Sequence, residues 1–195
     1  MAVKIEKTFQ VQQPIEKVWN FLSDPKKVVV CVPGAKITEQ VDDHNYKGSI
    51  SMKVGPTVTD FSGEIQILRL DAQAREIEIL GKGKDVRGKG GASMKMTGSL
   101  RSLPDGGTEV VSVSEVSVVG ILAQVGSRMI NEVSNIMFRQ FVVNFQEQLK
   151  AIPGPTSLGA AAATLAAPKP IKALPLALRA LWAAITRLFR RGKTD

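Results

Sequence analysis

The chain has 195 residues, of which 44% are hydrophobic and 23% charged, and it carries a formal net charge of +8. These values are typical of one globular domain of roughly 100–200 residues with a tail. Residues 151–195 hold seven basic residues against Asp195 alone, so +6 of the charge lies there and +2 remains for residues 1–150. A nearly neutral body argues against nucleic-acid binding, and the single cysteine, Cys31, excludes an intramolecular disulfide.

The N-terminal segment predicts a strand followed by two short helices. Residues 3–11 alternate between apolar and polar side chains, as in a half-buried strand. Residues 14–24 begin with Pro14 and place Trp19 on the apolar face of a short helix, and a second helical turn is expected over residues 25–32. No charged stretch followed by an apolar core is present at the N-terminus, so we expect no secretory signal and a cytoplasmic protein.

Six further strands and a long helix complete the predicted domain. The strands are expected over residues 35–41, 46–54, 57–70, 75–82, 91–100 and 108–118, separated by turn-forming Gly, Pro and Asp residues. Residues 120–150 contain no proline and predict the long helix. This order predicts an α+β fold, a curved antiparallel sheet wrapped on a long C-terminal helix. If the sheet does not close fully on that helix, an apolar cavity remains between them.

Residues after 150 predict a linker and a terminal amphipathic helix. Residues 151–173 are rich in proline and alanine, as expected for a flexible linker. Residues 174–191 place large apolar side chains on one helical face and arginines on the other, and they are too short and too charged to cross a bilayer comfortably. This segment could lie on a membrane, dock into a partner or fold back onto its own domain. The residues expected to contact a membrane are Leu178, Arg179, Leu181, Trp182, Ile185, Leu188, Phe189 and Arg190.

Three segments resemble one protein family. They are VVVCVPGAKITEQ, YKGSISMKVGPTVTDFSGEIQI and SVVGILAQVGSRMINEVSNIMFRQFVVNFQEQL, which contain Pro33-Gly34, Val54-Gly55-Pro56 and Gly126-Ser127-Arg128. Residues 2–150 resemble the CoxG family of carbon monoxide dehydrogenase subunits. That family belongs to the helix-grip superfamily, which also contains START lipid-transfer and birch-pollen-allergen-like domains.

The resemblance implies an accessory role and not an enzymatic one. CoxG-like proteins are thought to attach an aerobic molybdenum carbon monoxide dehydrogenase to the cytoplasmic membrane and to link it to the quinone pool. The resemblance therefore implies a membrane-tethered carrier of an isoprenoid quinone, menaquinone or ubiquinone, with no covalently bound cofactor. The implied partners are the dehydrogenase, anionic membrane lipids and the quinone, and the implied location is the cytoplasmic face of the cell membrane.

The predicted cavity is lined by the inward positions of several strands and of the covering helix. Period-2 alternation groups Met52 with Val54, Phe61 with Ile65, and Met94 with Met96, and methionines suit a lining that adapts to lipophilic guests. The expected ligand-binding residues are Trp19, Met52, Val54, Phe61, Ile65, Ile79, Met94, Met96, Leu122, Val125, Met129 and Val133.

Candidate catalytic and metal-binding residues are few. The only histidine, His44, follows Asp42 and Asp43 in a turn, so we expect a solvated hairpin and no metal site. The glycine-rich stretch KGKDVRGKGG joins two strands and is expected to be a basic, flexible hairpin. Glu115 is the only good candidate for an acid or base inside the cavity, but we expect it to point to solvent. Two alternatives to a carrier thus remain: a ligand-free recruitment or assembly subunit, and an enzyme of the cyclase or hydratase type that uses Glu115.

Overall fold

The chain forms one curved antiparallel sheet that wraps around a long helix. The computed structural model describes residues 1–54 and 57–152, which belong to one compact unit, Met1–Ile152. The strands are β1 (Ala2–Val11), β2 (Ala35–Gln40), β3 (Asn45–Val54), β4 (Thr57–Asp71), β5 (Glu76–Asp85), β6 (Gly90–Ser102) and β7 (Thr108–Gly120). Their order in the sheet is β1-β7-β6-β5-β4-β3-β2, and every neighbouring pair is antiparallel.

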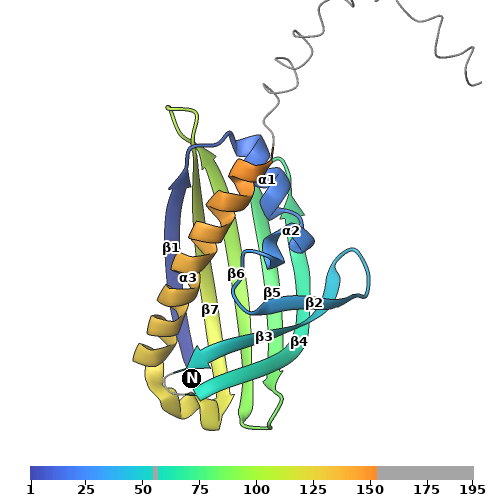
Figure 1. The fold of residues 1–195 in the computed structure, drawn as a ribbon, viewed down its shortest axis with the longest axis vertical. Helices are drawn as coiled ribbons and strands as arrows, with labels where there is room; N and C mark the ends of the chain where they lie inside the picture. Colours follow the sequence, from blue (N-terminus) through green and yellow to red (C-terminus); the bar gives the residue numbers. More distant parts are fainter. Residues whose placement is uncertain (55–56, 153–195) are drawn as a thin grey trace, which may run out of the picture. The chain divides into compact units, whose positions relative to one another are not determined.

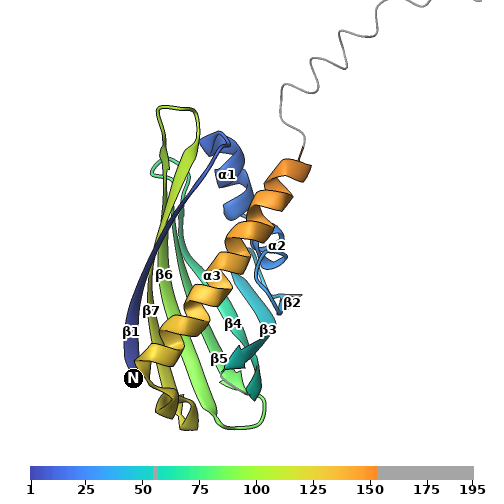
Figure 2. The same cartoon turned by 60° about the vertical axis from the view of Figure 1, so that its left-hand side comes forward.

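Four helical segments accompany the sheet. They are α1 (Ile15–Leu22), α2 (Pro25–Val29), the 3₁₀ helix η1 (Ile121–Val125) and α3 (Gly126–Ala151). Helix α3 crosses the concave face of the sheet, with α1 and α2 beside its C-terminal half (Figures 1 and 2). The α+β fold and the two short helices after the first strand are as expected from the sequence.

The structure differs from the sequence prediction at two glycine-rich regions. The long helix begins at Gly126 instead of residue 120, because Gly120 and Gly126 both have positive φ angles and bracket a separate 3₁₀ turn. Strand β5 continues through Gly81 and Gly83 to Asp85, so most of the predicted flexible hairpin is strand. Both differences arise at glycines, whose backbone adopts strand or left-handed conformations with little cost.

The largest cluster of buried side chains lies at one end of the interior. The core is built from α1, the C-terminal half of α3 and the adjoining ends of β1, β6 and β7. Phe145 contacts both Phe9 and Phe21 edge-on, with ring centroids 5.8 and 5.2 Å apart. The buried core residues are Val11, Val18, Trp19, Phe21, Cys31, Leu100, Val110, Phe145 and Leu149. Burial of the Cys31 thiol raises its pKa above the ordinary value, which identifies it as a packed, un-ionised side chain.

No described helix is sufficiently long and apolar to span a bilayer. The linker predicted over residues 151–173 and the membrane-binding helix predicted over 174–191 lie outside the described residues, apart from positions 151 and 152. Directly after the end of α3, the carbonyl oxygen of Ile152 accepts a hydrogen bond from the ammonium group of Lys17 at 2.9 Å.

Candidate functional site

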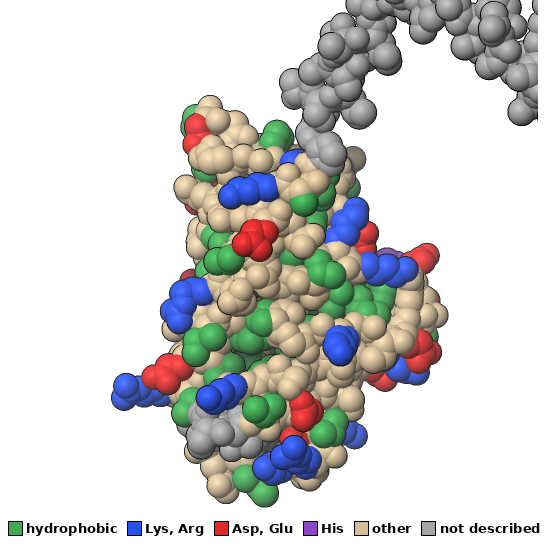
Figure 3. Space-filling view, viewed as in Figure 1, with side chains coloured by type: hydrophobic (Ala, Val, Ile, Leu, Met, Phe, Trp, Pro, Cys, Tyr) green, Lys and Arg blue, Asp and Glu red, His purple; other side chains and the backbone are tan. Residues whose placement is uncertain are grey.

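A cavity of about 520 Å³ lies between the concave face of the sheet and α3. This volume falls within the range of roughly 300–1,000 Å³ that small-molecule sites occupy. Strands β2 to β7 contribute to it, together with Pro25 and Val29 of α2 and four residues of α3. Its surface is almost wholly apolar. In the space-filling view the apolar side chains gather in a hollow at the middle of the face, with charged groups around it (Figure 3).

A row of small residues forms the floor of the cavity. Across the sheet, Gly48 pairs with Gly63, Gly63 with Gly83, and Gly83 with Ala92. These positions lie on the concave face, and all four line the cavity. Where other folds of this size would place Val, Leu or Phe side chains, this row supplies almost no side-chain volume, so the space above it stays open.

The glycines of the floor have two distinct physical roles. A Cβ at Gly63 would lie 1.9 Å from the carbonyl oxygen of Lys82, and one at Gly48 would lie 2.6 Å from that of Lys36, so close backbone approach requires glycine at both positions. At Gly83 and Gly81 the nearest atoms to an added Cβ are 3.6 and 3.9 Å away. There the missing side chain simply leaves room in the cavity.

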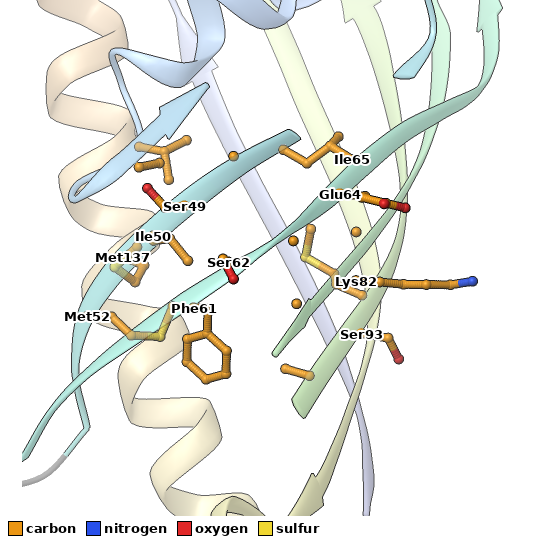
Figure 4. A pocket seen from close by; sticks show the side chains of 18 of the residues that line it. Ser49, Ile50, Met52, Phe61, Ser62, Glu64, Ile65, Lys82, Ser93 and Met137 are labelled. Atoms are coloured by element: carbon orange, nitrogen blue, oxygen red, sulfur yellow. The ribbon is translucent and has the colours of Figure 1, made fainter. Parts of the chain in front are cut away.

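Five of the twelve predicted ligand-binding residues line the cavity. Met52, Phe61, Ile65 and Met94 come from β3, β4 and β6, and Val133 comes from α3. Figure 4 shows Met52 and Phe61 close together at one end of the cavity, with Ile50 and Met137 above them. The strand alternation therefore predicted the inward positions of β3, β4 and β6 correctly.

Four other predicted residues lie elsewhere in the fold. Trp19 belongs to the core, where its ring is covered by the guanidinium of Arg75 at 5.5 Å. Ile79 and Met96 pair with each other next to Gly81 and Met94, but they are not part of the lining. Met129 is half-buried and also not part of it. The side chains of the remaining three, Val54, Leu122 and Val125, lie outside the described part of the chain.

The face that α3 turns toward the cavity differs from the predicted one. The residues that line it are Ile130, Val133, Ser134 and Met137. Burial of Phe145 and Leu149 in the core fixes the rotation of the helix, and positions 130, 134 and 137 then follow on the same face at helical spacing. Ile136, by contrast, is 57% exposed. The pattern of apolar residues in the N-terminal half of α3 does not by itself define this rotation. The rotation follows from the burial of Phe145 and Leu149 in the core.

Sequence reasoning missed the floor glycines, Tyr46 and Ser134. Tyr46 is buried beside the cavity, and its hydroxyl donates to the carbonyl oxygen of Asp43 at 3.1 Å. Burial, followed by the charges of Asp24, Asp43 and Asp42, raises the pKa of this phenol above its ordinary value, so it remains neutral. Ser134 is the one hydroxyl that α3 brings to the lining. The available signal for Tyr46 was alternation along its own strand, which places it on the same face as Ile50 and Met52.

Charged residues near the cavity point away from it. Glu64 and Lys82 contribute to the lining with the atoms nearest their backbone. The carboxylate of Glu64 and the ammonium group of Lys82 extend away from the cavity (Figure 4). Glu115 does not enter the cavity: it is exposed on the convex face, between Lys4 and Lys95 in the strand register. Alternation in β7 turns Val116 inward and Glu115 outward, so of the two orientations open for Glu115 the structure has the solvent-facing one.

The predicted turn around His44 is an exposed hairpin. The Asp42 carboxylate accepts hydrogen bonds from the backbone N–H groups of His44 and Asn45, both at 2.8 Å, and from the Asn45 side chain. The hydrogen bond from the Asn45 side chain, followed by that from the His44 backbone N–H, lowers the pKa of Asp42 below its ordinary value. These hydrogen bonds also account for the shape of the turn without a ligand, and no cluster of three metal-ligating side chains occurs among residues 1–54 and 57–152.

The curved seven-stranded sheet, the long covering helix and the apolar cavity between them define a helix-grip domain of the START-like class. Solved structures agree with this assignment. A conserved protein from Geobacillus kaustophilus superposes with a TM-score of 0.69 at 19% identity, covering 76% of this chain and 96% of that one. The ZhuI aromatase/cyclase from Streptomyces sp. R1128 gives 0.57 at 14%, covering 77% and 94%. A START superfamily protein from Mycobacterium smegmatis gives 0.55 at 12%, covering 77% and 99%.

The sequence profile of the CoxG family of carbon monoxide dehydrogenase subunits matches residues 8–150. The chain belongs to this family, as the resemblance in its sequence implied. A direct comparison with curated protein sequences gave no match. The likenesses to solved structures are all below 20% identity in the three cases above, and they show the fold alone.

Proposed function

We propose that the protein is a carrier that binds an isoprenoid quinone in the cavity between the sheet and α3. In this role it links a molybdenum carbon monoxide dehydrogenase to the quinone pool of the membrane, from the cytoplasmic side. The single observation that supports this most strongly is the cavity itself: about 520 Å³, almost wholly apolar, and kept open by a floor of glycines.

The shape and chemistry of the cavity suit a flat ring with an apolar chain. The row of Gly48, Gly63 and Gly83 presents backbone instead of side chains, so a planar ring can lie close to the sheet. The thioethers of Met52, Met94 and Met137 adapt to an irregular isoprenoid chain. The hydroxyl of Ser134 is a suitable donor for a quinone carbonyl oxygen, which a wholly apolar lining would leave without a partner.

The family suggests the proposed partner. The CoxG family is by its name associated with carbon monoxide dehydrogenase, and an accessory subunit of that enzyme needs no reacting groups of its own. A carrier needs an apolar site that accepts and releases its ligand, without groups that transfer protons. Among the described lining residues, the charged ends of Glu64 and Lys82 face outward and Tyr46 is neutral.

The proposed membrane attachment rests on the sequence after residue 150. Half-burying seven large apolar side chains of residues 174–191 would contribute on the order of 5–10 kcal/mol, and each basic residue about 1 kcal/mol at an anionic surface, before the cost of ordering the helix. The linker of residues 151–173 would span roughly 25–30 Å on average as a flexible coil, enough for the domain to turn between membrane and enzyme.

The proposal is tested by extraction of quinone from vesicles. Full-length protein is incubated with anionic vesicles that contain menaquinone, and quinone is then quantified on the protein after the vesicles are removed. We expect about one quinone per chain, and a Trp182→Glu, Phe189→Glu variant should bind vesicles more weakly while still accepting quinone from detergent. A wild-type protein that takes up no quinone from either source would contradict the carrier function.

One structural comparison gives a reason to test for an enzymatic function. The ZhuI aromatase/cyclase shares the fold, so a catalytic use of this cavity has to be examined. Glu115→Gln should leave quinone uptake unchanged, because the carboxylate lies on the convex face. An acid–base enzyme that depended on this group would instead lose about 10²–10⁴-fold in rate.

A further inference from the structure

One end of the sheet presents large apolar side chains to solvent. Here β5 turns into β6, β4 begins, and β7 runs into η1 (the lower end in Figure 1). Val86, Val119 and Ile121 are 59%, 61% and 62% exposed, and Val58 is 52% exposed. We call these four residues with Lys53, Lys84, Arg87 and Lys89 the loop end. The core lies at the opposite end, beside α1, so these exposed side chains are not incompletely packed core residues.

The turn that carries Val86 is held firmly in place. Asp85 is 5% exposed, and its Oδ1 accepts hydrogen bonds from the backbone N–H groups of Arg87 and Lys89 at 2.9 and 3.0 Å. The N–H of Val86 donates to the carbonyl oxygen of Asp60 at 2.9 Å. The exposure of Val86 is thus a stable feature of the fold, and the one carboxylate of the turn is turned inward.

The charge of the loop end is basic. Lys53, Lys84, Arg87 and Lys89 make no ion pair with another residue in the described ranges 1–54 and 57–152. At the opposite end, by contrast, basic groups are matched: Arg69 pairs with Asp71 and Glu76, and Arg75 with Glu16. The apolar side chains of the loop end are therefore interspersed with basic side chains that form no ion pair in the described ranges.

We propose that the loop end is a second membrane-contact surface, distinct from residues 174–191, which inserts Val86 and Ile121 into the interface of an anionic bilayer. Apolar side chains with lysines and arginines between them are the combination that binds this interface, through buried apolar area and attraction to anionic lipids. The proposal does not depend on which ligand fills the cavity. Phe61, which lines the cavity, pairs with Asp85, so contact at the loop end brings that part of the cavity next to the bilayer.

The test places an environment-sensitive fluorophore at each end of the full-length protein. Val86→Cys is labelled with a nitrobenzoxadiazole group, and Gln73→Cys, in the exposed turn between β4 and β5, is the matched control. Cys31 is fully buried and remains unlabelled in the folded protein. With phosphatidylglycerol vesicles, we expect the label at position 86 to shift its emission to shorter wavelength and to be quenched by lipids brominated on the acyl chain. The label at position 73 should show neither change.

Charge reversal gives a second readout. Each basic residue near an anionic surface adds about fivefold in affinity, so Arg87→Glu with Lys89→Glu should weaken the fluorescence-detected contact by about tenfold or more. Lys26→Glu with Arg101→Glu, at exposed positions away from the loop end, should leave it unchanged. No acyl-chain quenching at position 86 on vesicle-bound protein, or equal quenching at 73, would overturn the proposal. So would a response at position 86 to a protein partner but not to vesicles.

Discussion

Gly81 and Met94 face each other across β5 and β6 on the concave side of the sheet, and a Cβ at Gly81 would lie 3.9 Å from the nearest atom, the carbonyl oxygen of Met94. The glycine is therefore not required by its backbone or by close packing. Its effect is to leave space inside the cavity, and substitutions there can change the volume without a clash with the backbone.

The two kinds of floor glycine should differ in their effect on stability. Gly63→Ala should lower the free energy of unfolding by about 2 kcal/mol or more, because the new Cβ would meet the Lys82 carbonyl oxygen at 1.9 Å and force the strands apart. Gly81→Ala should change it by less than about 1 kcal/mol, since there is room for the methyl group. Urea unfolding of the two variants measures the difference. Equal destabilisation by both would contradict the distinct roles assigned to these glycines.

The rotation of α3 can be tested with neighbouring substitutions. Met137→Trp should reduce quinone uptake because the indole would occupy the cavity, whereas Ile136→Trp should not, because position 136 is 57% exposed. Equilibrium binding of a short-chain naphthoquinone, together with circular dichroism to verify the fold, provides the measurement. A loss of uptake in the Ile136 variant alone would mean that the helix presents the other face.

Ser134 should contribute modestly to ligand affinity. Replacing Ser134 by alanine removes one hydroxyl from the lining, and a net hydrogen bond of about 0.5–1.5 kcal/mol corresponds to roughly 2–12-fold in affinity. Ser127→Ala, an exposed position near the start of the same helix, is the control and should bind normally. If Ser134→Ala binds as tightly as the wild type, the carbonyl oxygen of the ligand has another partner.

Stability should fall in alkaline solution. The pKa of Cys31 is raised by burial, so the folded state holds its proton more strongly than the unfolded state does. The corresponding stabilisation is fully present below the unfolded pKa, near 9.0, and is lost as the pH rises through the folded value. Urea unfolding at pH 7 and pH 10 should show the decline, and Cys31→Ala should make it shallower. An unchanged slope in this variant would assign the alkaline loss to other groups.

The sequence predicted the elements better than it predicted the cavity. Alternation identified all seven strands, and proline and glycine positions marked α1 and α2, because these signals are local. The cavity depends on pairing between distant strands: Gly48, Gly63 and Gly83 form a floor only once the register is known. Gly83 was predicted to lie in a hairpin because glycine usually marks turns, and Trp19 was assigned to the cavity although it fills the core.

The presence of a lipophilic ligand in the cavity is the central claim, and it is tested most directly by the material that copurifies with the protein. Full-length wild-type protein and the variants Gly81→Leu and Lys95→Leu are purified from membranes, and organic extracts are analysed by mass spectrometry. Leucine at position 81 fills the cavity, whereas position 95 is exposed on the convex face of the neighbouring strand β6 and lies outside the loop end. We expect an isoprenoid quinone in extracts of the wild type and of Lys95→Leu, and at least tenfold less in those of folded Gly81→Leu. Equal amounts in all three, or no lipophilic molecule in the wild type, would contradict the account.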